Sequence, residues 1–236
     1  MKILPWDFFL NTIIQETSNA LVAEKLTPLT EGKFLQFIGL WFLMATVSGF
    51  SRSNYWSTKE FNERKNPCPF NFSAFMSKRR FDAINRELRF TSKAAPHYTD
   101  RIWEVREMIV AWNKHMASVF SPSWILCLDK SMSIWHNMFT CPGWVYCPRK
   151  PHPFGNEYHT VCCAKSGILT QIELVEGKDR PAEMEAPEFD NKGKTVGLLL
   201  RLLQPYFTSC RYVVLDSGFC VLKGIVELRK RGVFAG

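Results

Sequence analysis

The stretch Trp124-Ile-Leu-Cys-Leu-Asp-Lys-Ser-Met-Ser-Ile134 sets the interpretation of the whole sequence. Residues 125–128 form an apolar run typical of a buried strand, and the run ends on Asp129. A second apolar run, Tyr212 to Leu215, ends on Asp216 in the same way. Two buried strands that each end on an aspartate predict one site, assembled at the ends of neighbouring strands.

Paired aspartates are suited to a divalent metal ion, because such an ion takes hard oxygen ligands on rigid elements and leaves room for water and phosphate. The alternative is that each aspartate only starts a turn or caps the following helix. The pattern alone leaves both interpretations open.

The composition is that of a folded, basic protein. The 236 residues are 46% hydrophobic and include nineteen Phe and eight Trp, which is too apolar for a disordered chain. The formal net charge is +8, and the basic excess is spread along the chain. This favours a polyanionic partner such as nucleic acid, although the same charge is compatible with any basic soluble protein.

The sequence also bears on compartment. The start, Met-Lys-Ile-Leu-Pro-Trp-Asp7, has a proline and an acid where a secretory signal needs an apolar core. The longest apolar stretch, residues 34–47, contains Gln36 and is too short to span a bilayer. The eight cysteines include no Cys-x-x-Cys pair. We therefore expect an intracellular, reduced, soluble protein that is not secreted and has no membrane partner.

The first half of the sequence is expected to be helical. Residues 5–21 and 103–120 have apolar side chains at helical spacing. Thr27-Pro-Leu-Thr-Glu31 has the residues of a helix start, with Thr27 as the cap. The apolar run from 34 to 44 that follows is predicted to be a central core helix.

Residues 77–90 are expected to form an amphipathic helix with one strongly basic face. That face contains Lys78, Arg79, Arg80, Arg86 and Arg89. Such a face is either simply solvated or contacts DNA phosphates. Arg149 and Lys150, in the proline-rich segment 148–153, are further candidates for DNA contacts, with an exposed loop as the alternative. Aromatic residues flank this segment and either stack on unpaired bases or pack in the core: Trp135, Trp144 and Tyr146.

After Ser121-Pro122 the hydrophobic pattern changes from helical spacing to strand-like runs, so we place a domain boundary between 1–122 and 123–236. Strands are expected at 125–134, 158–164, 168–175 and 212–215, with a hairpin turn at 165–167. Helices are expected at 195–207 and 219–231, and residues 233–236 begin another strand.

Two other kinds of site are suggested by residue type. The ligand types of a zinc site occur together: Cys141, Cys147, His152 and His159. Their spacing does not fit a zinc finger, and we assign no zinc site. Cys162 and Cys163 suggest a thiol nucleophile, but buried structural cysteines are the more common outcome on a strand.

The element order resembles the ribonuclease-H-like fold, in which the first and fourth strands each carry a catalytic acid. Residues 34–236 resemble the transposase region of the piggyBac family through the order and spacing of several segments. These are Phe37-Ile-Gly-Leu40 with Met44, Tyr55-Trp-Ser-Thr58, Met76-Ser-Lys-Arg-Arg-Phe81, Leu88-Arg-Phe90, Leu128-Asp129, Pro148-Arg-Lys-Pro151, Gly155 and Leu215-Asp-Ser-Gly-Phe219.

The resemblance implies a DNA-cutting and joining transposase that is nuclear, or cytoplasmic before import. It implies a mixed α+β fold, with a helical N-terminal region packed on an incomplete ribonuclease-H-like mixed sheet with flanking helices. It makes Asp129 and Asp216 the ligands of Mg²⁺ (or Mn²⁺) and DNA the partner, with no small-molecule substrate and with a homodimer left open.

Three departures from the family set limits on this expectation. The family's third acid belongs well beyond Asp216, on a later helix, and Glu227 is the only acid among residues 217–236. The family's cysteine-rich zinc-binding tail is not in the sequence either. Lys130 stands where many relatives carry an acid, and would compete with a metal for Asp129 or hold a phosphate. Whether the chain is an enzyme is therefore open, and the alternatives are an inactive DNA-binding remnant and a protein-interaction scaffold.

Overall fold

The computed structural model describes residues 3–47, 51–57, 70–94, 102–141, 144–148, 150–175 and 187–236. It separates into a helical unit, residues 6–93, and an α+β unit, residues 94–236 with the first five residues. The division falls earlier than the boundary we expected after residue 122. No helix in the described ranges has the length and apolar character needed to cross a membrane.

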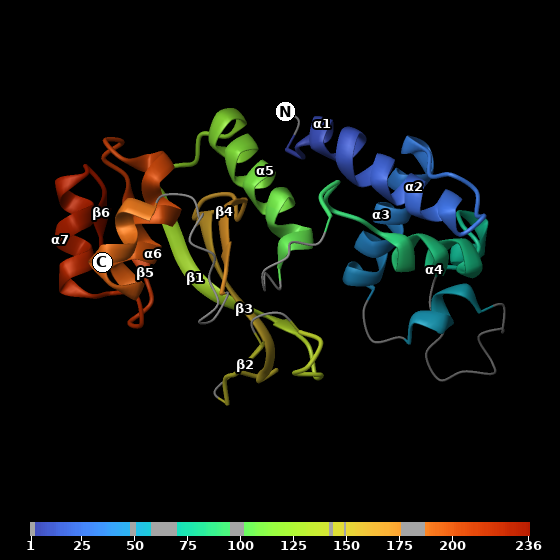
Figure 1. Cartoon of the computed structure of the whole chain (residues 1–236). Helices are drawn as coiled ribbons and strands as arrows, with labels where there is room; N and C mark the ends of the chain where they lie inside the picture. Colours follow the sequence, from blue (N-terminus) through green and yellow to red (C-terminus); the bar gives the residue numbers. More distant parts are fainter. Residues whose placement is uncertain are drawn as a thin grey trace. The chain divides into compact units, whose positions relative to one another are not determined.

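The helical unit contains three main helices (Figure 1). Its elements are α1 (Trp6–Phe8), the π-helical η1 (Phe9–Ile14), α2 (Gln15–Ala23), α3 (Glu31–Thr46), the 3-10 helices η2 (Arg52–Trp56) and η4 (Phe72–Ala74), and α4 (Lys78–Glu87). An aromatic cluster forms its core. The Phe81 ring lies 5.0 Å from that of Phe37 and 4.9 Å from that of Trp56, whose indole nitrogen donates to the Met76 carbonyl at 2.7 Å.

Helix α3 differs from the expectation in two ways. Thr30, not Thr27, is its N-cap, because Thr30 has an extended backbone and its hydroxyl accepts from the Lys33 amide at 3.3 Å. The helix is also buried along a single stripe that includes Phe37, while Phe42 on the other side is 65% exposed. It is therefore not the all-round core helix that its composition predicted.

A mixed sheet organises the α+β unit. Its strands are β1 (Ile125–Ile134), β2 (Trp144–Tyr146), β3 (Phe154–Cys163), β4 (Leu169–Leu174), β5 (Tyr212–Leu215) and β6 (Phe234–Ala235). β3 is antiparallel to β1, β2 and β4, whereas β5 is parallel to β1 and β6 is parallel to β5. Three antiparallel strands followed by parallel crossover strands is the arrangement expected for a ribonuclease-H-like sheet.

Neither β2 nor the first four residues of β3 were predicted from the sequence. β3 begins at Phe154, four residues before the strand predicted at 158, and its first part pairs with β2. Gly155, with φ of 152°, makes this extension possible, since a Cβ there would lie 1.9 Å from the Ser133 carbonyl oxygen. β2 has only three residues, which is too short for a hydrophobic pattern to predict.

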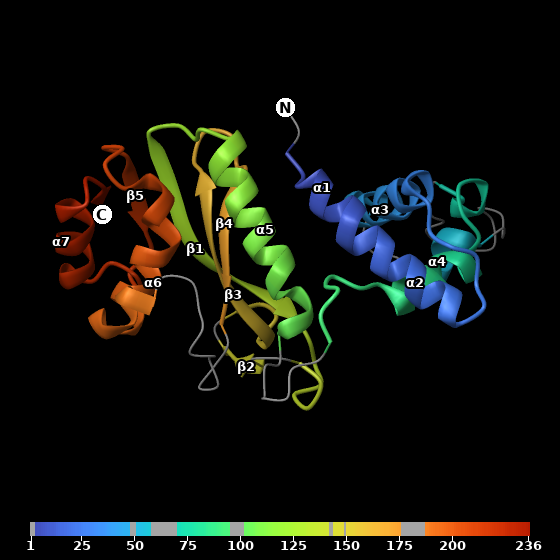
Figure 2. The ribbon, with the colours of Figure 1, turned by 45° about the horizontal axis from the view of Figure 1, so that its top comes forward.

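Three helices flank the sheet: α5 (Trp103–Val119), α6 (Lys194–Leu203) and α7 (Leu222–Lys230), with the short η5 (Pro187–Lys192) and η6 (Gln204–Tyr206) beside α6. Both views of the ribbon show α5 alongside β4 (Figures 1 and 2). The Asn113 side chain donates to the Ile172 carbonyl and accepts from the Ile172 amide, each at 2.9 Å. Because α5 bonds to the sheet in this way, it belongs to the α+β unit, although we had assigned it to the helical region.

The core of this unit lies between the sheet and helices α6 and α7. Leu126 and Leu128 of β1 and Val213 of β5 are buried there against leucines of α6, such as Leu199 and Leu203. These strand residues alternate with exposed or half-exposed ones, so one face of β1 and β5 is packed. Alternation thereby fixes which side chains at the strand ends turn toward α6.

Candidate functional site

Each of the two predicted aspartates directly follows a leucine, and the two leucines are partners on neighbouring strands. β1 and β5 are parallel, and Leu128 is in register with Leu215. The expectation that these strands are parallel neighbours is confirmed. Asp129 and Asp216 are each the next residue, so their backbones are neighbours at the edge where β5 ends. β1 does not end on its aspartate as expected but continues past Asp129 to Ile134, paired with β3. Both aspartate side chains are exposed.

Local hydrogen bonds hold both carboxylates. Oδ1 of Asp129 accepts from the Lys130 amide at 2.7 Å. Oδ1 of Asp216 accepts from the Gly218 amide and from the Ser217 hydroxyl, each at 2.9 Å. The Gly218 and Ser217 donors, helped by the positive charges of nearby lysines, hold the pKa of Asp216 below its usual value. Asp216 is therefore ionised at neutral pH.

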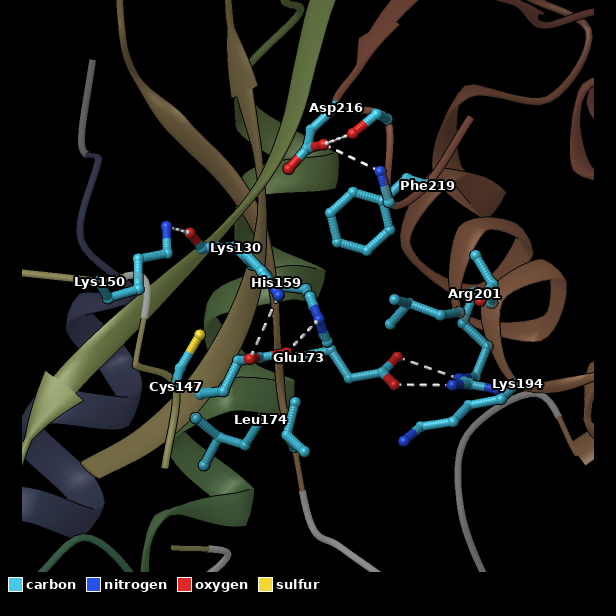
Figure 3. Close-up of a pocket in the computed structure, with 16 residues that line it drawn as sticks. Lys130, Cys147, Lys150, His159, Glu173, Leu174, Lys194, Arg201, Asp216 and Phe219 are labelled. Carbon is cyan, nitrogen blue, oxygen red and sulfur yellow. Dashed lines mark hydrogen bonds and ion pairs between the residues drawn. The ribbon is translucent and has the colours of Figure 1, made fainter. Parts of the chain in front are cut away.

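A pocket of about 810 Å³ lies at this edge, on the α6 side of the sheet (Figure 3). Strands β1, β3 and β4, helix α6, the segment after β2 and the loop after β5 supply its walls. Asp216 lines the pocket together with Lys130, Lys150 and Lys194. Among the described residues, Asp129 is not part of this lining, and strand alternation places it on the face opposite Leu128 and Lys130.

The pocket wall contains a charged network on β3 and β4. Glu157 lies 3.2 Å from His159 and 3.6 Å from Lys130. Arg201 of α6 binds Glu173 through two contacts of 2.7 and 3.0 Å. The fork geometry fixes α6 against β4 at the floor of the pocket.

His159 is the most enclosed titratable group in this wall. It is 8% exposed, and its ring packs edge-on against Phe219 with the centroids 5.3 Å apart. Nδ1 of His159 is buried and has no hydrogen-bond partner in the described part of the chain. Burial lowers the pKa of His159, an effect that the negative charge of Glu157 opposes.

Lys130 does not take the place that its sequence position suggested. Its ammonium group points into the pocket and its ion pair is with Glu157, not with Asp129. The expected competition with a metal at Asp129 is therefore not seen, because alternation turns the two side chains to opposite faces. Lys150 donates to the Lys130 carbonyl at 3.3 Å, which brings a second cation to the same wall.

Sequence reasoning did not select Glu157, Glu173 or Arg201. Glu157 and His159 are two residues apart on one strand, so period-two alternation could have placed them on one face. Glu173 and Arg201 come from a strand and a helix that are joined by a long segment, and their pairing has no local sequence signal.

The basic helix face predicted at residues 77–90 is largely occupied by internal contacts. Arg80 donates to the carbonyls of Thr27 and Pro28 at 2.6 and 2.8 Å, and Lys78 pairs with Asp82 at 2.7 Å. Arg79 is exposed and has no such contact within the described ranges.

Arg86 and Arg89 both contact Glu87, at 2.7 and 3.4 Å. Arg89 lies beyond the end of α4, which stops at Glu87. Of the two other predicted DNA contacts, Lys150 lines the pocket and Arg149 lies outside the described residues. The structure thus leaves Arg79 as the member of the α4 set with most freedom to meet a phosphate.

Glu227 is occupied by cations of its own helix and of the preceding segment. Its carboxylate contacts Arg231 at 2.8 Å, Lys230 at 2.9 Å and Lys192 at 3.8 Å. These partners, Lys230 first, lower the pKa of Glu227 to about 2. Glu227 is therefore a structural ion-pair centre and does not replace a third metal-binding acid.

The other candidate ligands do not converge. In the ranges that the structure covers, no group of three or more His, Cys, Asp or Glu side chains is placed to hold a metal ion. Burial raises the pKa of the Cys162 thiol. At Cys163, burial is outweighed by hydrogen bonds with Ser123 and Ser166, which lower the pKa of its thiol to about 6, but the residue is only 2% exposed and so is closed to a substrate.

The strand order, with one aspartate midway along β1 and one directly after β5, defines the class: a mixed α+β protein whose sheet has the strand order expected of a ribonuclease-H-like fold. The family model described as Transposase IS4 matches residues 1–236, so the chain belongs to that transposase family. The motif-based assignment to a transposase is thereby confirmed. A comparison with curated proteins gave no match.

One solved structure is similar over nearly the whole chain, a cryo-EM structure of a piggyBac transposase synaptic complex with hairpin DNA. The TM-score is 0.70 at 19% sequence identity, and the match covers 98% of this chain and 50% of that one. The likeness establishes a shared fold. This chain spans about half the length of the piggyBac chain.

Proposed function

We propose that this chain forms the first part of a transposase catalytic site, in which Asp129 and Asp216 hold a divalent metal ion, Mg²⁺ or Mn²⁺, for phosphodiester cleavage and strand transfer in DNA. The observation that carries the proposal is the parallel register of Leu128 with Leu215, which brings both aspartates to one edge of the sheet.

The two carboxylates fit such an ion in kind. Mg²⁺ takes oxygen ligands, often only one or two protein carboxylates, and completes its shell with water and phosphate. Both side chains are exposed, and in each case the hydrogen bonds described above engage Oδ1. When bound, the metal would activate the attacking oxygen and stabilise the leaving oxygen of a phosphodiester.

The surrounding residues have positioning roles in this proposal. The Gly218 amide and Ser217 hydroxyl fix the carboxylate of Asp216 and keep it ionised. Lys150 and Lys194, which line the same pocket as Asp216, supply positive charge for a DNA phosphate. The net charge of +8 and the DNA in the similar piggyBac complex support DNA as the partner.

Iron-mediated cleavage of the polypeptide tests the metal site without requiring DNA cleavage. Fe²⁺ substituted for Mg²⁺, with ascorbate and peroxide, should cut the backbone near residues 129 and 216. Asp129→Asn and Asp216→Asn should each abolish both cuts. Glu104→Gln, which removes an exposed acid from α5 of the same unit, should leave both cuts in place. Equal fragments from all four proteins would refute the metal site.

A second candidate function is DNA binding without cleavage. The absence of a third converging ligand among the described residues favours it, because a two-metal mechanism needs ligands for both ions. The two candidates separate cleanly in experiment, since a binding remnant retains salt-sensitive duplex binding but gives no metal-dependent nicking.

A further inference from the structure

The sheet has an extension that the metal site does not use. We call residues 131–156 the β-arm: it comprises the end of β1, the strand β2, the start of β3 and the connections between them. In both ribbon views β2 and the adjoining ends of β1 and β3 lie apart from α6 and α7 (Figures 1 and 2). The arm therefore extends from the aspartate edge without a covering helix from that pair.

The β-arm contains no acidic residues. Its 26 residues contain no Asp or Glu, although 22 acids in 236 residues would put two or three in a stretch of this length. Their basic residues are Lys150, which lines the pocket and donates to the Lys130 carbonyl, and Arg149, which lies outside the described residues. A surface free of acids can approach a polyanion without like-charge repulsion.

Large apolar side chains are exposed along the β-arm. Phe139 is 88% exposed, Tyr146 57% and Trp135 49%, with Ile134 and Met138 also exposed. Exposed apolar residues that gather in one segment mark a binding surface, whereas scattered ones need no explanation.

Three of the rings form an ordered row. The Tyr146 and Phe154 centroids are 5.0 Å apart with the planes at 24°, and the Phe154 and Trp144 centroids are 5.9 Å apart at 21°. These are stacked arrangements. Tyr146, at one end of the row, is its most exposed member, so another flat ring can stack there.

Hydrogen bonds within the β-arm fix its indoles. Nε1 of Trp135 donates to the Thr140 hydroxyl at 2.9 Å, and Nε1 of Trp144 donates to the Trp135 carbonyl at 3.1 Å. The polar groups of both rings are thus satisfied internally, and the rings lose little freedom when a ligand stacks on them.

The row of rings shares a face with Asp129. Asp129 pairs with Thr160 and Tyr146 pairs with Phe154, and Thr160 and Phe154 are six positions apart on β3. An even separation keeps side chains on one face of a strand, at a spacing of about 20 Å. This is about six nucleotides at 3.4 Å per stacked base.

We propose that the β-arm binds an unpaired DNA strand, with bases stacked on Tyr146 and Trp135 about six nucleotides from a phosphate at the metal ion that Asp129 would hold. The site rests on the proposed function for its partner. Unpaired bases are the occupant that the surface favours, because aromatic rings stack on any base and a stretch without acids does not repel the backbone.

Fluorescence anisotropy with a 5′-labelled 12-nucleotide single strand and a 20-base-pair duplex tests the proposal on the full chain. Tyr146→Leu and Trp135→Leu should each weaken single-strand binding by roughly five- to 150-fold, the range of one base–aromatic stack. Tyr146→Phe should keep the affinity within about twofold, because the ring is retained. Trp124→Leu is the matched control, because Trp124 is 68% exposed and directly precedes Ile125, the first residue of β1, at the end of the strand away from the β-arm. Thermal melts confirm that each variant is folded.

The position of the stack is tested with 2-aminopurine, whose fluorescence is quenched by stacking. 2-Aminopurine is placed at successive positions along a strand, counted from the phosphate at the metal site. Its Tyr146-dependent quenching should be strongest about six nucleotides away.

Unchanged single-strand affinity in Tyr146→Leu and Trp135→Leu, with duplex binding and metal binding intact, would overturn the β-arm site and leave the proposed function standing. If Tyr146→Leu or Trp135→Leu changed the mass of the protein in solution relative to the unmodified chain, without changing its DNA affinity, the β-arm would be a protein interface. Loss of all DNA binding by the unmodified chain would remove both proposals.

Discussion

Leu128 and Leu215 are partners in a parallel strand pair, and each is followed directly by an aspartate. The two leucines are buried against α6 and α7, so hydrophobic burial fixes the register of β1 and β5. A one-residue slip would turn Leu215 out of the core. The same burial therefore places Asp129, midway along β1, beside Asp216, the first residue after β5.

Arg80 and Arg79 should have opposite roles although they are adjacent. Arg80→Ala removes two hydrogen bonds to the carbonyls of Thr27 and Pro28 and should destabilise the helical unit by about 1–2 kcal/mol in a urea titration. Arg79→Ala should change stability by less than about 0.5 kcal/mol and should weaken duplex binding instead. Equal stability of the two variants would contradict the assignment of Arg80 as a structural contact.

Asn113 protects the open edge of β4. Asn113→Ala removes both bonds to the Ile172 backbone and should cost about 1–3 kcal/mol in chemical denaturation, with increased self-association from the uncovered strand edge. The neighbouring, exposed Lys114→Ala is the control. A monomeric, fully stable Asn113→Ala protein would show that α5 does not protect this edge.

Glu227 should make the α+β unit sensitive to acid. Its pKa in the folded protein, about 2, lies below the ordinary value of 4.5, so the ionised form favours the folded state. This contribution is complete above about pH 4.5 and is lost as the pH falls toward 2. Glu227→Gln should lower stability at pH 7 and flatten the dependence between pH 4.5 and 2, measured by urea melts. Parallel pH curves for the two proteins would contradict this role.

Gly155 should be required for the β-arm. Gly155→Ala places a Cβ 1.9 Å from the Ser133 carbonyl oxygen at a φ of 152°, so the strand must shift, at a cost of about 2–4 kcal/mol. Gly167→Ala also has a positive φ but meets no atom within 4 Å, and should cost only about 1 kcal/mol. Thermal melts of both variants make the comparison, and similar losses would show that the close approach is unimportant.

Much of the α+β unit was predictable because its signals are local. The apolar run before Asp129, the turn at 165–167 and the leucine pattern of α6 each depend on residues close in sequence. The pairing of Arg201 with Glu173 depends on tertiary packing and left no local trace. Lys130 was misjudged for a related reason: adjacency in sequence suggested a contact with Asp129, whereas strand alternation separates the two side chains.

The helical unit shows the limits of composition. The apolar run of α3 predicted burial all round, yet only one stripe is buried and Phe42 is exposed. The basic face of α4 predicted free cations, yet Arg80 is bound to backbone carbonyls more than fifty residues earlier in the chain. In both cases the sequence identified the kind of residue but not its contacts, because contacts between residues distant in sequence depend on the fold.

The most direct test of the central claim, that Asp129 and Asp216 share one metal ion, is Mn²⁺ binding followed by electron paramagnetic resonance in a double-mutant cycle. We expect Asp129→Asn and Asp216→Asn each to weaken Mn²⁺ binding at least tenfold, about 1.4 kcal/mol, and the double variant to lose little more. Such non-additivity is the signature of two ligands on one ion. Independent, additive losses, or Mn²⁺ binding unchanged in all three variants, would contradict the account.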